Sequence, residues 1–539
     1  MSNTPVLPAD QAVALIPDRA VVTVSSSSGL GCPDLVLEAL GRRYDSERSP
    51  SSLTLMHPIA AGDMYGIKGI DHLAKPGMIE RIYAGSYPSG PSKMAPPAVR
   101  TLIESGQVQA YNIPSGVMYQ LQRAAATRQP GVFTQVGLGT YADPRNSGAK
   151  MNIATDDYVQ VVTIGDEEWL FYPTVPVDVA IIRATTADPD GNLSYEHEGS
   201  SLGALDQAYA AHNRGGLVIA QVERVSATRS PAATVRVPGI LVDVVVVAPE
   251  QMQTTQTSYD PALCGAEVRA LDTIEPIDWG LEKVISRRAA AEIARHDIVN
   301  LGFGISANVP RVLLEEGDHH EVTWVIEQGA VGGFPLTGFA FGCALNPQAL
   351  MQSADQFTLL SGGGFDIAML SFLEVSAVGD VNVSHLPARP HVTAGVGGFA
   401  DITTHAPQLV FSGYFTAGRK DIAIVDGALE IRRDGDIPKF VPEVAQITFA
   451  GRMGKHRNQQ VLYVTERAVI ELIDGVLTVV EIAPGVDLQR HVLDKAAVPL
   501  AVSDDLKPMN ATLFRPDKMG LSLRSPRRGR LDLPAGTAL

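Results

Sequence analysis

A pattern of strand, loop and helix occurs twice in this chain, and this duplication restricts the fold more than any other feature. In the first copy the β-branched run 21–24 precedes a serine-rich loop and a helix that begins at Asp34. In the second copy the strand is 298–301 and the loop is rich in glycine, with Pro310 matching Pro33. Such loops at helix N-termini are typical of α/β domains and hold anionic groups on main-chain amides.

A second pair of segments supports the duplication. Residues 136–143 match residues 394–401, and both segments combine glycines with a terminal Asp. Two matched motifs in the same order predict an α/β protein with two homologous open domains and largely parallel sheets. The alternative is chance similarity among glycine-rich loops.

The chain has 539 residues, which is too long for a single hydrophobic core. After the apolar run 242–248, the stretch 251–262 has no apolar period, and this change predicts an inter-domain linker. The expected organisation is an N-terminal α/β domain over 1–250, a linker over 251–280, a C-terminal α/β domain over 281–520 and a basic tail over 521–539.

The charge balance narrows the class of partner. With a net charge of −16 and a pI of about 5.2, neither nucleic acid nor an anionic membrane is an expected partner. The three cysteines are scattered, which indicates a reducing compartment without disulfides. No signal peptide or long apolar run is recognisable, so we expect a cytoplasmic protein. His319 and His320 have no further ligands at metal spacing, and no metal site is predicted.

The stretch 321–333 contains the strongest candidate for chemistry. Its apolar run 322–326 predicts a buried strand, and Glu327 then lies at the C-terminal end of that strand. The glycines that follow allow the backbone to pass close to a ligand, and ligands of open α/β sheets bind at this edge. The alternative is a solvated glutamate on a turn.

Two other segments suggest different chemistry. Residues 302–307 fit the spacing G-x-G-x-x-A of a dinucleotide-binding loop, as a reductase would need. Pro310 in the first helical turn, and serines in place of glycines in the first copy, weigh against that interpretation. Cys343 lies in an apolar context without a partner His, and we expect a buried small side chain there instead of a nucleophile.

Taken together and in order, seven segments resemble family I coenzyme A transferases, most closely the single-chain branch of propionate and acetate CoA-transferases, also described as acetate or 3-oxoacid CoA-transferases. The resemblance extends from about residue 8 to about residue 500 and includes the family's two homologous α/β halves. The segments are 111–116, 136–144, 183–192, 327–333, 362–366, 395–399 and 463–467.

The resemblance implies roles for individual residues. Glu327 falls on the family's catalytic glutamate, which becomes a glutamyl-CoA thioester during turnover. Gly397 and Gly398 fall on a loop whose amides lie against the reacting carbonyl, so they are the expected oxyanion donors. Asn382 and Glu466 are expected to line the site.

The glycines expected to contact coenzyme A are Gly363, Gly364 and Gly395. The first-half loop 25–28 departs from the resemblance, because relatives usually carry more glycine there, and this departure leaves the ligand contacts of the loop open. An apolar wall should keep water from the intermediates. Its candidates are Phe334, Phe339 and Phe399, with ordinary core packing as the alternative for each.

The expected activity is transfer of coenzyme A from a short-chain acyl-CoA to a free carboxylic acid, such as acetate, propionate or a 3-oxoacid, with ping-pong kinetics. No permanently bound cofactor is expected, since coenzyme A is itself substrate and covalent intermediate. The expected partners are acyl-CoA and small carboxylic acids, and the resemblance implies a homodimer or homotetramer. The alternatives are an acyl-CoA hydrolase using the same glutamate and a non-catalytic module that senses small ligands.

Overall fold

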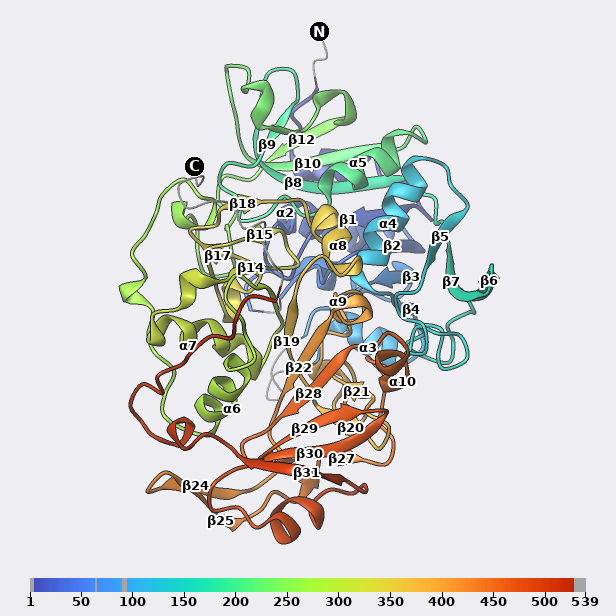
Figure 1. Cartoon of the computed structure of the whole chain (residues 1–539). Coiled ribbons are helices and arrows are strands. Elements are labelled where there is room, and N and C mark those ends of the chain that lie inside the picture. Colours follow the sequence, from blue (N-terminus) through green and yellow to red (C-terminus); the bar gives the residue numbers. More distant parts are fainter. Residues whose placement is uncertain (1–3, 64, 90–94, 528–539) are drawn as a thin grey trace.

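The computed structural model describes residues 4–63, 65–89 and 95–527. Two α/β halves follow each other along the chain, coloured blue to green and yellow to red in Figure 1. Each half is built around a central sheet whose core strands run parallel. The predicted α/β fold with two homologous, largely parallel halves is confirmed.

In the first half the strand order is β12-β10-β8-β1-β2-β3-β4, and all these neighbours pair in parallel. The short β9 and β11 extend this sheet by antiparallel pairing beside β8. The strands are β1 Val21–Val24, β2 Leu53–His57, β3 Ile79–Ala84, β4 Gln109–Asn112, β8 Val179–Ala187, β9 Leu193–Ser194, β10 Leu217–Val225, β11 Val235–Val237 and β12 Val244–Val247. The helices are α1 Ala9–Val13, α2 Asp34–Glu47, α3 Ala98–Glu104, α4 Ser115–Ala126 and α5 Ala204–His212.

In the second half the parallel order is β14-β13-β19-β22-β28, and antiparallel neighbours β15 and β29 follow at the two ends. The sheet strands are β13 Ile298–Leu301, β14 Thr323–Val325, β15 Ala330–Val331, β18 Ala349–Leu350, β19 Ile367–Ser371, β22 Gln408–Ser412, β28 Gln460–Val464, β29 Ala468–Ile473, β30 Val476–Ile482 and β31 Ala501–Pro508. The helices are α6 Leu281–Ala290, α7 Val309–Glu316, α8 Ser353–Ser361, α9 Phe399–His405 and α10 Gly451–His456.

Short strands form small additional sheets around these two. They are β5 Gly131–Thr134, β6 Gln160–Ile164, β7 Glu167–Pro173, β16 Phe334–Pro335, β17 Ala344–Leu345, β20 Glu374–Ser376, β21 Val381–Asn382, β23 Thr416–Ala417, β24 Asp421–Val425, β25 Ala428–Arg433, β26 Ile437–Pro438 and β27 Phe440–Val441.

The first predicted repeat matches the topology. Strand β1 pairs with β2 and β8, and β13 pairs with β14 and β19 in the same manner. The second predicted pair, 136–143 with 394–401, is wrong, because 136–143 precedes β8 whereas α9 follows β19. The topological counterpart of α9 is α5, since each helix connects the strand beside β1 or β13 to the next strand outward. The similarity of 136–143 reflects tight turning alone, with Gly137 and Gly139 at φ +88° and +78°.

The predicted linker is part of the packed structure. Ala262 and Leu263 are buried in a small cluster with Leu30 of the first half and Cys343 of the second half. Cys343 is 1% exposed and burial raises its pKa to about 12, which confirms a buried small side chain.

The start of the predicted basic tail is also anchored. Arg524 pairs with Glu292 at 2.7 Å, and Arg527 pairs with Asp297 at 3.0 Å. Residues 521–527 therefore belong to the second half, while 528–539 lie outside the described residues. The remaining domain boundaries stay predictions.

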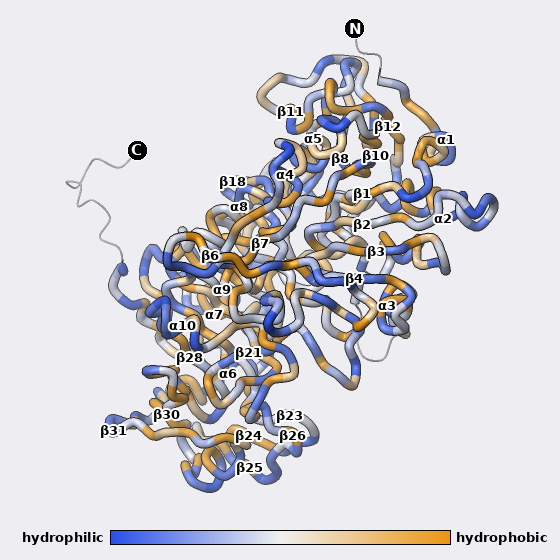
Figure 2. The backbone as a smooth tube through the Cα atoms, turned by 90° about the vertical axis from the view of Figure 1, so that its right-hand side faces the viewer, coloured by the Kyte–Doolittle hydropathy of each residue, from blue (hydrophilic) through white to orange (hydrophobic). Residues whose placement is uncertain are grey.

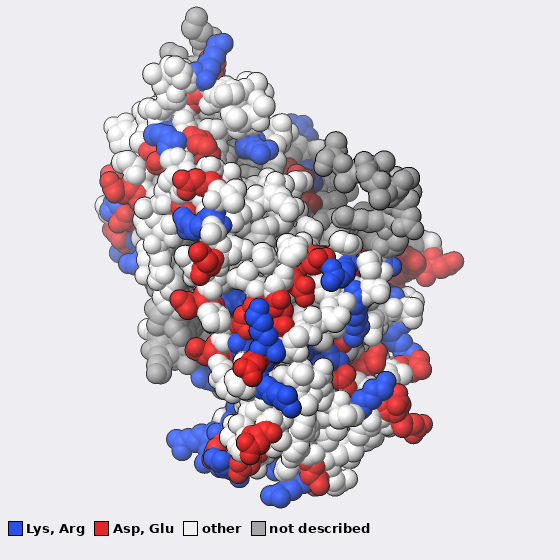
Figure 3. Space-filling model, turned by 60° about the vertical axis from the view of Figure 1, so that its left-hand side comes forward, with Lys and Arg blue, Asp and Glu red and all other residues white. Residues whose placement is uncertain are grey.

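The apolar residues lie mainly along the central strands, as the orange stretches of the tube in Figure 2 show. On the face shown in Figure 3, Lys and Arg side chains are interspersed with Asp and Glu, and no broad single-sign area is seen there. None of the helices within residues 4–63, 65–89 and 95–527 has the length and apolar character needed to cross a membrane.

Candidate active site

Glu327 follows the end of β14, at the carboxyl edge of the second parallel sheet. Immediately after it the chain turns back into β15, with the Gly329 amide donating to the Ile326 carbonyl at 2.9 Å. Gly329 has φ +120°, and a Cβ there would collide with the Met351 carbonyl. The sequence thus fixes a tight turn that presents the glutamate at the sheet edge.

The carboxylate is enclosed by polar donors and an aromatic ring. Its Oε1 accepts a hydrogen bond from Gln328 Nε2 at 3.1 Å. Its Oε2 lies against Gly398, where an added Cβ would overlap this oxygen and come within 2.7 Å of the Phe357 ring. Burial raises the pKa of Glu327 to about 7, while hydrogen bonding from Gln328 and from the Gly398 backbone acts in the opposite direction. The residue keeps some exposed surface, so a reactant can approach.

The glycine loop before α9 is held by the first half of the chain. The Gly397 amide donates to the Gly85 carbonyl at 2.8 Å, and the Ser115 amide donates to the Gly397 carbonyl at 2.9 Å. The Val396 amide donates to Asn112 Oδ1 at 2.9 Å. Because its amide donates to Gly85, away from the glutamate, whereas the Gly398 backbone bonds to Glu327 itself, Gly397 is the poorer oxyanion donor in this conformation. Gly398, beside the glutamate, remains the better candidate of the predicted pair.

A second buried carboxylate lies close to this loop. Asp401 on α9 is fully buried and accepts hydrogen bonds from the Gly116 amide at 3.0 Å and Ser361 Oγ at 3.2 Å. Burial raises its pKa to about 7, and the charge of Glu327 adds to the shift. Two neighbouring acids without a paired cation disfavour one another's ionisation.

The residue after the glutamate connects the two halves. Gln328 is 2% exposed, and its Nε2 donates both to Glu327 Oε1 and to Ser27 Oγ, each at 3.1 Å. Its main-chain carbonyl accepts from Ser353 Oγ at 2.9 Å and also from Ser200 Oγ. The serine loop 25–28 of the first half is therefore connected to Glu327 through the side chain of Gln328.

Two residues predicted to line the site are engaged elsewhere. Asn382 is fully buried and its Nδ2 donates to Glu374 and to the His385 carbonyl, both at 2.8 Å. Glu466 accepts from the Phe415 amide at 2.9 Å and from Arg467 at 2.8 Å. The contacts of Asn382 lie within one short segment, Glu466 connects to a separate segment at Phe415, and none of these contacts involves Glu327. Their roles in the site stay predictions.

The glycines expected to contact coenzyme A allow tight turns and close approaches of the backbone in this conformation. Gly363 and Gly364 close the C-terminal end of α8, where their amides donate to Leu360 and Leu359 carbonyls at 3.1 and 2.9 Å. Gly395 has φ +106°, and a Cβ there would lie 2.6 Å from Asn112 Oδ1. Their contacts with coenzyme A stay a prediction.

The aromatic wall is formed by a residue that sequence reasoning missed. Phe357 on α8 contacts the site, whereas Phe334 packs in the cluster around Cys343 and Phe399 packs against Phe411. Phe339 is 37% exposed and stacks edge-to-face with Tyr65. The sequence gives no indication of this role for Phe357, because the pattern of a helix does not show which part of the fold the helix packs against.

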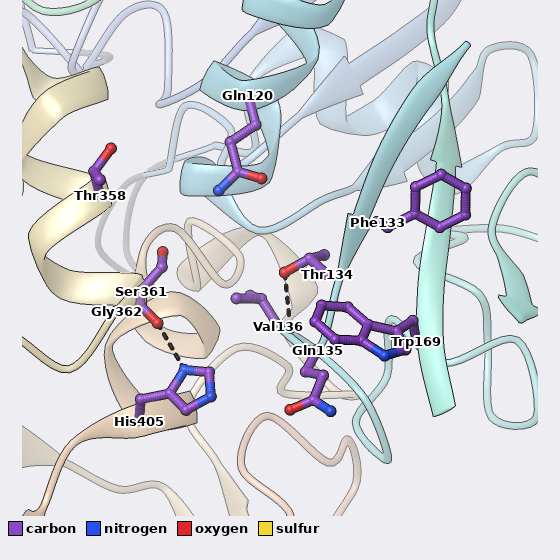
Figure 4. Close-up of a pocket in the computed structure, with 10 residues that line it drawn as sticks. All are labelled: Gln120, Phe133, Thr134, Gln135, Val136, Trp169, Thr358, Ser361, Gly362 and His405. Carbon is purple, nitrogen blue, oxygen red and sulfur yellow. Dashed lines mark hydrogen bonds between the residues drawn. The ribbon is translucent and has the colours of Figure 1, made fainter. Parts of the chain in front are cut away.

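A separate cavity of about 280 Å³ lies between the halves, next to α4 and α8. Figure 4 shows Trp169 and Phe133 on one side, with Thr358, Ser361 and His405 opposite. His405 Nδ1 is bonded to the Ser361 carbonyl at 2.7 Å. Glu327 does not line this cavity, so the cavity is not assigned to the reaction.

Comparisons with known proteins agree with this geometry. A family model described as coenzyme A transferase matches residues 6–248. A caffeate CoA-transferase of Acetobacterium woodii is 38% identical over 94% of this chain and 96% of that protein. The chain belongs to the coenzyme A transferase family. The predicted CoA-transferase is thereby confirmed, and a non-catalytic ligand-sensing module is not supported.

Other members of the coenzyme A transferase family match the chain over nearly its whole length. The acetate CoA-transferase YdiF of Escherichia coli K12 is 36% identical over 97% of this chain and 97% of that protein. A crystal structure of the acyl-CoA transferase YdiF of Escherichia coli O157:H7, a thioester complex with CoA, has a TM-score of 0.88 and 34% identity. That comparison covers 97% of this chain and 99% of the YdiF chain.

Within the described ranges, no group of three or more His, Cys, Asp or Glu side chains is arranged to hold a metal ion. His319 and His320 lie in a short, partly exposed turn, where His320 contacts Glu321 at 3.5 Å.

Proposed function

We propose that this protein transfers coenzyme A between an acyl-CoA and a free carboxylic acid, with Glu327 as the group that carries coenzyme A between them. The observation that supports this role is a carboxylate at a strand end, enclosed by Gly398 and Phe357 and open to a reactant. A carboxylate suits the task because its anhydride and thioester are close in energy to those of the acid that it exchanges.

The reaction proceeds in two chemically similar stages. Glu327 attacks the acyl-CoA carbonyl, the carbon–sulfur bond breaks, and an acyl-glutamyl anhydride and the CoA thiolate result. The thiolate then attacks the glutamyl carbonyl and releases the first acid, leaving a glutamyl-CoA thioester. A second acid reverses the sequence, and the kinetics are ping-pong.

Exclusion of water decides between transfer and hydrolysis. Phe357 and the glycine loop enclose one side of the carboxylate, where water would otherwise attack the anhydride or thioester. This enclosure favours transfer over the hydrolase alternative.

We also propose short-chain acids as substrates and a homodimer or homotetramer in the cytoplasm as the working form. A panel of acetate, propionate, a 3-oxoacid and an aromatic acid tests the first point. The aromatic acid belongs in the panel because a relative is a caffeate CoA-transferase. Light scattering after size-exclusion chromatography tests the second.

The decisive experiment is incubation with acyl-CoA without an acceptor. The expected result is a mass increase equal to coenzyme A on the peptide that contains Glu327, which borohydride reduces. Glu327→Ala should lose the adduct and at least about 10⁴-fold in turnover while keeping its unfolding temperature. Full activity in that variant contradicts the proposal.

Adding a labelled carboxylic acid then separates the two activities. A transferase moves the label into acyl-CoA, whereas a hydrolase releases free coenzyme A at the same rate with or without the acid.

A further inference from the structure

The proposed reaction needs two separate sites for a developing negative charge. In the first step the charge develops on the oxygen of the substrate acyl group. In the second step the thiolate attacks Cδ of Glu327, and the charge develops on an oxygen of the glutamate itself. Hydrogen-bond donors already aimed at that oxygen would lower the second barrier without reorganisation.

We propose that Gln328 is a catalytic residue that stabilises the tetrahedral intermediate on Glu327, and that Ser27 is a positioning residue that holds the Gln328 amide. This inference rests on the proposed function of Glu327. Its basis is the pair of 3.1 Å hydrogen bonds from Gln328 Nε2 to Glu327 Oε1 and to Ser27 Oγ.

The Gln328 amide can take only one orientation beside an ionised glutamate. Both Nε2 hydrogens are used by the two acceptors, and the buried Oε1 has no partner among the described residues. Rotating the amide by 180° would bring its oxygen against Glu327 Oε1, which is repulsive. An unpaired buried acceptor costs about 1–3 kcal/mol, so this arrangement is more expensive than simple packing requires.

The surroundings of Gln328 keep the side chain from moving. Its main-chain carbonyl is bound by Ser200 of the first half and Ser353 of α8. A Cβ on Gly342 would lie 2.8 Å from Gln328 Cδ, so the chain passes closely over the amide. A donor fixed in this way is organised before the reaction begins.

This geometry assigns different tasks to the two oxygens of Glu327. Oε1 is held by Gln328, so Oε2, beside Gly398, is the oxygen that attacks the acyl group. When the thiolate adds to Cδ, the new carbon–sulfur bond moves the carbonyl electron pair onto Oε1. Collapse breaks the bond from Cδ to Oε2, which leaves with the first acid. Gln328 donates a hydrogen bond throughout and transfers no proton.

The test uses Gln328→Met, which keeps the length of the side chain and removes the donor. The expected result is a fall of about 10²–10³-fold in the rate at which acyl-CoA labels Glu327, because one oxyanion donor has been lost. Ser27→Ala should slow labelling by about 3–10-fold, through looser positioning of the amide. The matched control is Ser26→Ala, since Ser26 Oγ bonds to the Ser28 carbonyl and not to Gln328.

The double variant separates positioning from general damage. If Ser27 acts only through Gln328, Ser27→Ala/Gln328→Met should label no more slowly than Gln328→Met alone. If the double variant slows labelling by the product of the two single-variant effects, the role of Ser27 is overturned.

A pH profile supplies a readout that a purely structural role would not move. Removing the donor destabilises the carboxylate, so the acid limb of labelling should shift to higher pH in Gln328→Met. The titratable groups whose charge interacts with Glu327 are Asp401 on α9 and Tyr119 on α4, and both are unchanged in this variant. An unshifted limb with a wild-type labelling rate overturns the inference. If the wild-type protein itself forms no adduct on Glu327, the proposed function fails instead.

Discussion

The two halves contact each other at two sites that share the same hydrogen-bond pattern but differ in function. At the first, the Ser115 amide on α4 donates to the Gly397 carbonyl at 2.9 Å; at the second, the Ser353 amide on α8 donates to the Leu202 carbonyl at 2.9 Å. The hydroxyl of each serine also bonds to a carbonyl just past a strand, Pro58 after β2 or Gln328 after β14. In Figure 1, α4 and α8 lie side by side in the centre of the molecule.

The difference lies at the strand ends. Strand β2 ends at the buried His57, and residues 58–62, which follow it directly, include no carboxylate. Beyond β14 the chain places Glu327 against Gly398, whereas the equivalent Gly203 lies against the Tyr119 ring. The duplication therefore provides a frame, and the chemistry depends on a few residues that only one copy has.

The acidic residues of the two helices differ in the same way. Asp206 on α5 pairs with Arg123 at 2.8 Å, and Arg123 also binds Asp355 of α8. Asp401 on α9, its counterpart, has amide and hydroxyl donors and forms no ion pair with any described residue. In the first copy this aspartate pairs with Arg123 of the same half, and Arg123 in turn binds Asp355 of the second half. The other copy keeps a second acid near Glu327.

The largest expected difference is between two alanine substitutions. Gly398→Ala should reduce turnover by at least about 10²-fold, because the new methyl group overlaps the carboxylate that must react. Gly203→Ala should lower the free energy of unfolding by about 1–3 kcal/mol, because the new methyl group overpacks against Tyr119, and should leave kcat nearly unchanged. Steady-state exchange and urea unfolding measure both, and equal losses of kcat would show that the copies are not functionally distinct.

The pH dependence of the first half-reaction should show one acid limb. Because the pKa of Glu327 is raised to about 7 by burial, labelling by acyl-CoA should fall about tenfold per pH unit below that value. Burial lowers the pKa of His57 to about 4, so the other strand end contributes nothing near neutrality. Rapid-quench labelling between pH 5 and 9 checks this, and a flat profile would contradict it.

The two aspartates should respond to neutralisation by different amounts. The pKa of Asp401 is raised to about 7, so the folded state binds its proton more tightly, and stability is lost as pH rises from about 4 through 7. Asp401→Asn does not ionise. Its free energy of unfolding should therefore rise relative to that of the wild type as the pH goes from 4 to 8, by on the order of 2–4 kcal/mol in total. Burial also raises the pKa of Asp206, but Arg123 opposes that shift, so Asp206→Asn should change the free energy of unfolding by no more than about 1 kcal/mol near pH 7.

Denaturant unfolding at several pH values measures both variants. A gain for Asp206→Asn as large as that for Asp401→Asn, or no gain for Asp401→Asn, would mean that burial and the Arg123 pair do not set the charge of these acids as argued.

The smallest expected effects come from the two serines. Ser115→Ala and Ser353→Ala each remove one buried hydrogen bond and should cost about 1 kcal/mol of stability. Only Ser353→Ala should also slow exchange, by a few-fold, because it loosens the Gln328 carbonyl next to the reacting glutamate. Thermal unfolding and kcat show whether this asymmetry exists.

Much of this architecture was accessible without coordinates. Alternation of strand, loop and helix predicted the α/β halves, and the apolar run before Glu327 predicted its place at a strand end, which β14 confirms. The second repeat was paired wrongly, because the glycines at 137 and 139 satisfy a turn that any tight loop requires. Asn382 and Glu466 were carried over from the resemblance; Asn382 bonds within its own segment, Glu466 bonds to the Phe415 amide, and their roles in the site stay predictions.

What the amino-acid sequence determined by itself is what depends on neighbours along the chain: the strands, the glycine turns and the residue at the end of β14. What only the tertiary structure decided is which groups surround that residue. Phe357 and Gly398 reach Glu327 through the folding of the second half, and Ser27 reaches it, through Gln328, only because the two halves pack together. The raised pKa follows from that packing, since burial is a property of the folded chain and of no single segment.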